Sequence, residues 1–339
     1  MRINPFLRLI VRLLTWLVVG IFILAGMGAI YQAVAARSDK HNYPAPGQLM
    51  DVGGYRLHIY CSGKGSPTVI LDAAADMMSS DWAWIQPEIA KQTRVCSYDR
   101  AGMGWSDPGP RPRDAKQIAS ELHTLLTNAG ISGPYVMVGH SVAGLYVRLY
   151  EAEYPDGVVG MVLVDPGLPD MDTRIPALQA QNASDAQLVG TMQVLSYFGL
   201  PRLLGIGKNN AHGLPPQQVA EVNAFVSTPR HWATILTLMD ATSTTYDEVR
   251  MTGSLGDKPL VVISANTAWF TPGAPADDTR RALNDLQSEL AGLSTNSSHR
   301  IVDGATHASL LHDQDDAQAV INAIEAVLAS LQTGQPLAQ

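Results

Sequence analysis

Hydrophobic residues recur along this chain in short runs separated by stretches of helix length. An alternating segment, Tyr55–Cys61, follows Gly53-Gly54, which indicates a hairpin with a strand before it. Later runs are rich in Val and Ile without polar alternation, as is typical of parallel strands covered on both faces. These runs are Thr68–Leu71, Arg94–Tyr98, Tyr135–Val138, Gly160–Val164, Leu260–Ser264 and His299–Val302.

Helical patterns lie between these predicted strands. In Asp114–Ala129, leucine and isoleucine recur at helical spacing, and Gly130 ends the pattern. Ala143–Tyr154 and Asp315–Leu331 are similar. The alternation of strand and helix predicts the α/β class with a mostly parallel sheet.

The block from 166 to 258 breaks this alternation. It contains no clear pair of strands, but it has helical patterns such as Gln217–Val226 and His231–Met239. A helical block between two core strands predicts a cap over the site, and the alternative is that its helices complete the core. We therefore expect a core at 51–165 and 259–331, a helical cap at 166–258, and a tail at 332–339.

The first 36 residues differ from the rest. Leu13–Ala36 carries no charge and, at about 1.5 Å per residue in a helix, can cross a hydrocarbon core of roughly 30 Å. Trp16 and Tyr31 lie near its ends, where aromatic rings favour the membrane interface. The segment 1–36 is therefore predicted to be a transmembrane anchor, and 37–50 a polar linker.

Flanking charges predict the orientation of this anchor. Arg2, Arg8 and Arg12 precede the span, against Arg37 and Lys40 after it, which favours a cytoplasmic N-terminus. The rest of the chain is then expected on the extracytoplasmic side of the inner membrane.

A second interpretation of the same segment stays open. Ala33-Val34-Ala35 fits the small-x-small pattern of a signal-peptidase site, so that cleavage would release a secreted protein.

Composition excludes some classes. The 23 Lys+Arg and 31 Asp+Glu give a net charge of -8, which argues against a nucleic-acid surface. The two cysteines lack metal-ligand spacing, so no metal is expected, and no organic cofactor is implied. The oligomeric state does not follow from the sequence.

The strongest chemical signal is the segment Val138–Gly144. It follows a predicted strand and opens a predicted helix, so Ser141 occupies a sharp, strained strand-to-helix turn with its hydroxyl exposed. The helix N-terminus behind Ser141 adds positive potential where an oxyanion would form. Ser141 is therefore the candidate nucleophile.

With Tyr98–Asp107 and Asp303–His307, this segment resembles the α/β-hydrolase superfamily, nearest the capped esterase and prolyl-aminopeptidase-like branch. The resemblance covers nearly everything from Asp51 to Leu331. It implies an eight-stranded, mostly parallel sheet with helices on both faces and a helical cap insertion. It also implies the chain order serine, acid, histidine.

The candidate base and acid come from strand ends. His307 follows a late strand, and His312 is the fallback. For the acid, the usual position after Leu260–Ser264 has no carboxylate, so Asp165 is preferred, with Asp277 or Asp278 as alternatives.

The oxyanion hole departs from the family pattern. The third strand ends in Asp72-Ala73-Ala74 in place of His-Gly, so a backbone N–H of Ala73 or Ala74 would pair with that of Val142. Asp72 disfavours an oxyanion unless it is paired or points away. In this fold the second and fourth strands are neighbours, so Cys61 and Cys96 are either a cross-strand disulfide or two buried thiols.

These features predict a serine hydrolase that acts on carboxylic esters through a Ser141–His307–Asp165 triad and an acyl-enzyme. An iminopeptidase or amidase is the enzymatic alternative. A degenerate hydrolase that binds a small ester or amide ligand without turnover is the alternative from another class.

Overall fold

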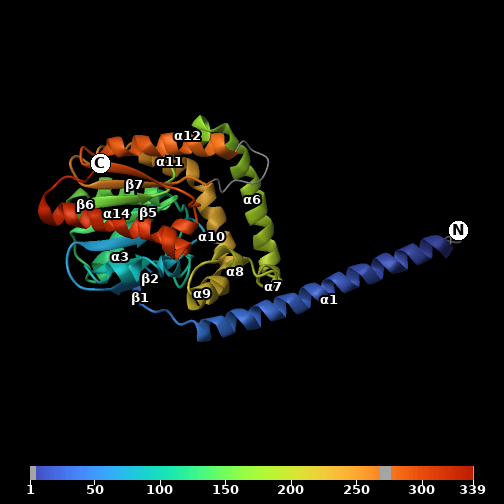
Figure 1. Ribbon diagram of the computed structural model, residues 1–339. Helices are drawn as coiled ribbons and strands as arrows, with labels where there is room; N and C mark the ends of the chain where they lie inside the picture. Colours follow the sequence, from blue (N-terminus) through green and yellow to red (C-terminus); the bar gives the residue numbers. More distant parts are fainter. Residues whose placement is uncertain (1–4, 268–275, 339) are drawn as a thin grey trace.

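The computed structural model describes residues 5–267 and 276–338, and an eight-stranded sheet forms the centre of the domain (Figure 1). The strand order is β1-β2-β4-β3-β5-β6-β7-β8, with β1 and β2 antiparallel to their neighbours and the other pairings parallel. The strands are β1 Gln48–Asp51, β2 Arg56–Ser62, β3 Thr68–Asp72, β4 Val95–Tyr98, β5 Tyr135–His140, β6 Val158–Val164, β7 Leu260–Ala265 and β8 Ser297–Val302. The predicted α/β class and mostly parallel sheet are confirmed.

The sheet is covered on both faces because alternate side chains of its strands point to opposite sides. On one face, Ile70 and Met137 pack with residues of α3 (Ala115–Asn128), α4 (Ala143–Glu153) and α12 (Ala276–Glu289). On the other face, Val69 and Val136 pack with residues of α2 (Gln86–Ile89) and α14 (Gln314–Thr333). Both faces are therefore dry, which explains the unbroken Val and Ile runs.

Helices fill the chain between β6 and β7. They are α5 Met171–Arg174, α6 Pro176–Ser196, α7 Leu200–Leu203, α8 Ile206–Asn210, α9 Pro216–Val226, α10 Pro229–Asp240 and α11 Thr242–Arg250. Tyr246 and Val249 of α11 pack with Ile118 of α3 and Leu145 of α4, so this helix completes the core. The short elements η1 Ser79–Trp82, η2 Pro155–Gly157, η3 Leu290–Leu293 and α13 Ser309–His312 lie in the connections between core elements.

The N-terminal helix is longer than the sequence predicts. α1 runs from Pro5 to Asn42, so its last turns occupy part of the expected linker at 37–50, and β1 begins inside that range as well. Asp39 holds the last turns by an ion pair with Arg202 of α7, and the helix ends before Pro44, which cannot continue it. Most of α1 projects away from the domain (Figure 1).

Cys61 and Cys96 form a disulfide between β2 and β4, where they lie directly opposite each other. Of the two alternatives left open by the sequence, the structure contains the cross-strand bond.

Candidate active site

Ser141 lies in a strained turn between β5 and α4. Its φ is 60°, a region that residues other than glycine rarely adopt. The Ser141 N–H donates to the Val164 carbonyl at 2.9 Å, and the Ser141 carbonyl accepts from the N–H groups of Gly144 and Gly167. These hydrogen bonds fix the conformation in which the side chain leaves the end of the sheet.

Asp165 and His307 meet beside this turn, each from the end of its own strand. His307 Nδ1 lies 2.7 Å from Asp165 Oδ2, and the Asp165 side chain is fully buried. Asp165 follows β6 with φ 40°, and His307 comes five residues after β8 ends. Because Nδ1 takes part in this hydrogen bond, proton exchange with a nucleophile would use Nε2.

Arg280 is the second side-chain partner of Asp165, and the sequence analysis did not predict it. Its Nη2 lies 2.5 Å from Asp165 Oδ1, and both side chains are buried. Burial alone would raise the pKa of Asp165, but the hydrogen bond with His307 and the charge of Arg280 hold it below its ordinary range. Asp165 is therefore a carboxylate at neutral pH.

Asp278, one of the alternative candidate acids, is not part of this arrangement. Asp278 is exposed on α12 and pairs with Arg281. The side chain of Asp277 lies outside the described residues. Of the candidate acids whose side chains the structure describes, Asp165 is the one that lies against His307.

His140, directly before Ser141, supports the His307 loop. Its Nε2–H donates to the His307 carbonyl at 3.0 Å, and the two rings lie 4.5 Å apart. Burial holds the pKa of His140 well below its ordinary value, so the ring is neutral. His140 therefore helps to position the His307 backbone.

The fallback base, His312, has its own acid. His312 Nε2 lies 2.8 Å from Asp81 Oδ1 in a buried pair. Burial opposes protonation, but the hydrogen bond with Asp81 and the charges of Asp81 and Asp76 raise the pKa of His312. His312 thus favours its charged form and is less suited than His307 to accept a proton from Ser141.

Asp72 is paired and buried. Its charge would otherwise disfavour an oxyanion near the end of β3. Its carboxylate bonds to Arg100 and to the Tyr98 hydroxyl, the latter at 2.7 Å. Arg100 also donates to the carbonyls of Ala73 and Ala74, and the Ala73 N–H bonds to Asp72. The negative charge near the site is therefore compensated by an adjacent guanidinium.

A cavity of about 570 Å³ opens at Ser141 and His307, between the core and the inserted helices. Ala74, Ala75 and Asp76 form its wall on the β3 side. Its opposite side is mostly apolar and comes from α6, α9 and α10: Leu188, Val189, Val222, Val226, Trp232, Ile235 and Met239. The cavity suits a ligand with a large apolar part and one polar group near Ser141.

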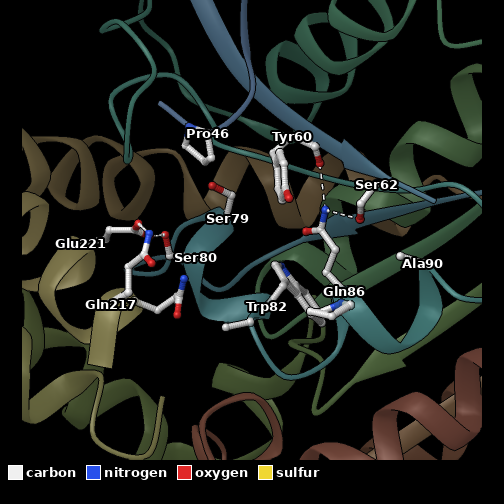
Figure 2. A pocket seen from close by; sticks show the side chains of 13 residues that line it. Pro46, Tyr60, Ser62, Ser79, Ser80, Trp82, Gln86, Ala90, Gln217 and Glu221 are labelled. Carbon is white, nitrogen blue, oxygen red and sulfur yellow. Dashed lines mark hydrogen bonds between the residues drawn. The ribbon is translucent and has the colours of Figure 1, made fainter. Parts of the chain in front are cut away.

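A second cavity lies on the other side of η1 and lacks this chemistry. Figure 2 shows Tyr60, Gln86 and Trp82 on one side of it and Gln217 and Glu221 of α9 on the other. Here the Ser80 hydroxyl donates to Glu221, and Gln86 donates to the Tyr60 carbonyl and to Ser62. The Ser80–Glu221 hydrogen bond fastens α9 to the core, and this cavity therefore marks the boundary between the insertion and the core.

Across the ranges 5–267 and 276–338, no group of three or more His, Cys, Asp or Glu side chains is arranged to hold a metal ion.

This chain belongs to the alpha/beta hydrolase fold family, whose model matches residues 67–269. Among curated proteins it is 30% identical over 165 residues to a probable transporter, efuK, of Hormonema carpetanum, covering 44% of this chain and 24% of that one. It is 31% identical over 129 residues to an uncharacterized vacuolar membrane protein of Saccharomyces cerevisiae, covering 33% of this chain and 20% of that one. The match thus spans about a quarter or less of these relatives.

Solved structures share the fold at low identity. An enol-lactonase from Burkholderia xenovorans has a TM-score of 0.59 at 21% identity, covering 83% of this chain and all of that one. A putative lipase from Acinetobacter baumannii has a TM-score of 0.62 at 16% identity, covering 90% and 97%. An epoxide hydrolase from Bacillus megaterium has a TM-score of 0.61 at 17% identity, covering 83% and 100%. These three neighbours are hydrolases by name, and their likeness shows that this chain shares their fold.

Proposed function

We propose that this protein is a serine hydrolase that cleaves carboxylic esters, with Ser141 as nucleophile, His307 as base and Asp165 as the acid that orients it. The observation that carries the proposal is the 2.7 Å hydrogen bond between His307 and Asp165 beside a cavity that also contains Ser141. A hydroxyl is a weak nucleophile at neutral pH until an imidazole accepts its proton, and a carboxylate fixes the tautomer of that imidazole.

The reaction runs in two halves. Ser141 Oγ attacks the ester carbonyl carbon while its proton passes to His307 Nε2, and His307 then donates that proton to the departing alkoxide. A water that His307 deprotonates attacks the acyl-enzyme, which releases the carboxylic acid and restores Ser141. In each half Asp165 stabilises the imidazolium, and Arg280 keeps Asp165 ionised.

The N–H of Val142, at the N-terminus of α4, and the N–H of Ala74 are the proposed oxyanion donors. Ala74 lines the cavity, whereas the Ala73 N–H is engaged by Asp72, so Ala74 is preferred to Ala73. Two backbone donors in a site shielded from water are typical of acyl transfer.

Serine at position 141 separates this chain from epoxide-opening chemistry. Epoxide hydrolases of this fold normally use an aspartate nucleophile, which forms an ester with the opened epoxide. An ester substrate is preferred to an amide because its alkoxide leaves more readily. Amide cleavage is the outcome that a parallel assay with an amide of the same acyl group would detect.

We also propose that α1 stays attached as a membrane anchor, with the catalytic domain on the extracytoplasmic side. The helix from Phe6 to Asn42 is long and apolar enough to cross a membrane, and its most apolar part is not buried by the domain. Gln32, inside the apolar stretch, donates to the Ser227 carbonyl at 2.9 Å, a contact that a discarded signal peptide would not need. The disulfide favours an oxidising compartment.

A fluorophosphonate probe tests the proposed catalytic serine. The full chain in detergent is labelled as wild type, Ser141→Ala and His307→Ala, with the exposed Ser288→Ala and His123→Ala as matched controls. We expect labelling and hydrolysis of 4-nitrophenyl esters in the wild type and both controls, and loss of both in the two site variants. A folded wild type that neither labels nor hydrolyses would make the chain a ligand-binding homologue without turnover.

A further inference from the structure

One face of the inserted helices is apolar and exposed; it comprises α6, α7 and the turn between them. Between 186 and 207 the single charged residue is Arg202, whose side chain is only 8% exposed because it pairs with Asp39 at 2.7 Å. The exposed apolar residues of this α6–α7 face are Leu188, Val194, Tyr197, Phe198, Leu203 and Leu204. A concentration of exposed apolar side chains on neighbouring elements marks contact with a protein or a membrane.

α1 leaves the domain beside this face. Gly28 packs so closely on the backbone of Phe198 that a Cβ there would overlap the Phe198 carbonyl oxygen. Four residues later Gln32 is buried, and its side chain accepts from Arg202 Nε at 3.1 Å. Figure 1 shows α6 and α7 on the side of the domain from which the N-terminal part of α1 departs.

The contact with Phe198 fixes the depth of the α6–α7 face relative to α1. About 20 helical residues cross a hydrocarbon core. Counted from Leu13, the first residue after Arg12, that length ends at Gln32. Phe198 touches α1 at Gly28, one helical turn before that end, so it lies at the outer edge of the hydrocarbon region. Tyr197 is beside it, and tyrosine favours this interface.

We infer that the α6–α7 face is inserted into the outer surface of the membrane that α1 spans. This inference rests on the proposed anchor. The occupant is lipid because the α6–α7 face continues the lipid-facing surface of α1 at the same depth. Arg202, which would be costly in this position, is turned inward to Asp39, and Lys208 follows where the face ends and can reach headgroup phosphates.

The placement also selects a substrate class. Leu188 of α6 lines the cavity that contains Ser141 and is at the same time 55% exposed on the α6–α7 face. The cavity wall is thus part of the membrane-facing surface, and the lining that α6, α9 and α10 provide is mostly apolar, with Asp185 and His231 as its polar members. The substrate is therefore an ester with a long apolar chain that is dissolved in the membrane.

A measurement of how deeply residues lie in the membrane tests the insertion of the α6–α7 face. The full chain is placed in phosphatidylcholine vesicles with one cysteine introduced by Leu203→Cys and labelled with an environment-sensitive fluorophore. Ile23→Cys in α1 and Met251→Cys, a residue 86% exposed after α11, are the controls. We expect lipid-bound nitroxides to quench the labels at 203 and 23 but not at 251. Quenching at 23 without quenching at 203 overturns the inference, and no quenching at 23 overturns the anchor as well.

Kinetics test the substrate class. Leu203→Asp with Leu204→Asp is compared with Met251→Asp on a soluble short-chain ester and on a long-chain ester dissolved in the vesicles. We expect the double variant to hydrolyse the vesicle ester about tenfold more slowly, because charged side chains at 203 and 204 oppose insertion of the α6–α7 face into the membrane. Its rate on the soluble ester should be unchanged. Equal effects on both esters overturn the assignment. A wild type inactive on both overturns the proposed hydrolase and with it the substrate class, while the depth measurement still decides the docking surface.

Discussion

At the scale of single residues, the unusual feature is that buried Asp165 has two side-chain partners, the partly buried His307 and the buried Arg280. A carboxylate taken out of water needs compensation, and here a permanent cation provides it in every protonation state of His307. Asp165 therefore stays ionised when His307 is neutral and when it is an imidazolium.

We predict that Asp165→Asn lowers kcat for ester hydrolysis by about 10⁴-fold, because an amide cannot hold the imidazole in the productive tautomer. The backbone around Ser141 should be unchanged. The measurement is steady-state kinetics with a 4-nitrophenyl ester, and Asp278→Asn, on the exposed surface of α12, is the matched control. A loss smaller than about tenfold would assign the acid to another residue.

The same variant reports on stability against pH. The pKa of Asp165 is lower in the folded chain than its ordinary 3.8, so ionised Asp165 stabilises the fold above that value. This contribution is lost as the pH falls through the lower, folded pKa. The difference in Tm between wild type and Asp165→Asn, measured in detergent, should therefore be largest near neutral pH and shrink below about pH 4.

The residues of the candidate site were predictable to different degrees. Ser141 and His307 each follow a strand that the pattern marks clearly, and parallel strands bring their ends to one edge of the sheet. Arg280 was not predictable, because its partner lies 115 positions away and its helix follows no recognised motif. Arg100 as the partner of Asp72 was also not predicted, because the pair joins the ends of two different strands.

At the scale of elements, β5 and α4 pack very closely at the turn that connects them. A Cβ at Gly139 would lie 2.6 Å from the carbonyl oxygen of Ala143, so the strand and the helix approach each other as closely as backbone atoms allow. Ala143 itself is fully buried, which shows that the turn accommodates one methyl at the position that is usually glycine.

We predict that Gly139→Ala lowers the free energy of unfolding by at least about 2 kcal/mol and removes fluorophosphonate labelling of Ser141. The added methyl overlaps backbone atoms, which cannot move without shifting the serine. Gly292→Ala, where a Cβ meets no atom within 4 Å, is the matched control and should change neither. Full labelling of Gly139→Ala would show that the turn is more tolerant than its packing indicates.

Elements with a plain periodicity were predictable, and those without one were not. The predicted strands and the helices at α3, α4, α9, α10 and α14 match within a few residues. α6 and α12 were not predicted, since α6 keeps many apolar residues on its exposed surface and α12 is strongly polar. The extension of α1 to Asn42 was missed because its last turns depend on an ion pair with a residue far along the chain.

At the scale of the whole molecule, the disulfide closes a long loop at the edge of the sheet. Cys61 and Cys96 are 35 positions apart and join the antiparallel part of the sheet to its parallel part. A cross-link over this separation mainly restricts the unfolded chain.

We predict that the double substitution Cys61→Ser with Cys96→Ser lowers the free energy of unfolding by about 4 kcal/mol. Differential scanning fluorimetry in detergent provides the Tm of wild type and variant. Dithiothreitol should lower the Tm of the wild type and leave that of the variant unchanged. If dithiothreitol left the Tm of the wild type unchanged, the disulfide would be absent from the purified protein.

The position of this bond has a mechanical consequence. With α1 as the proposed membrane anchor, the chain would leave the membrane through α1 and enter the domain at β1, the edge strand, followed by β2. A pull on the anchor, as the membrane bends or flows, would open such an edge one hydrogen bond at a time, because the load falls on one end of the ladder. The disulfide between Cys61, near the end of β2, and Cys96 transmits that force covalently to β4. The proposed anchor is thus linked covalently to the parallel part of the sheet. A force on α1 would then act less on the strands that precede Ser141, Asp165 and His307.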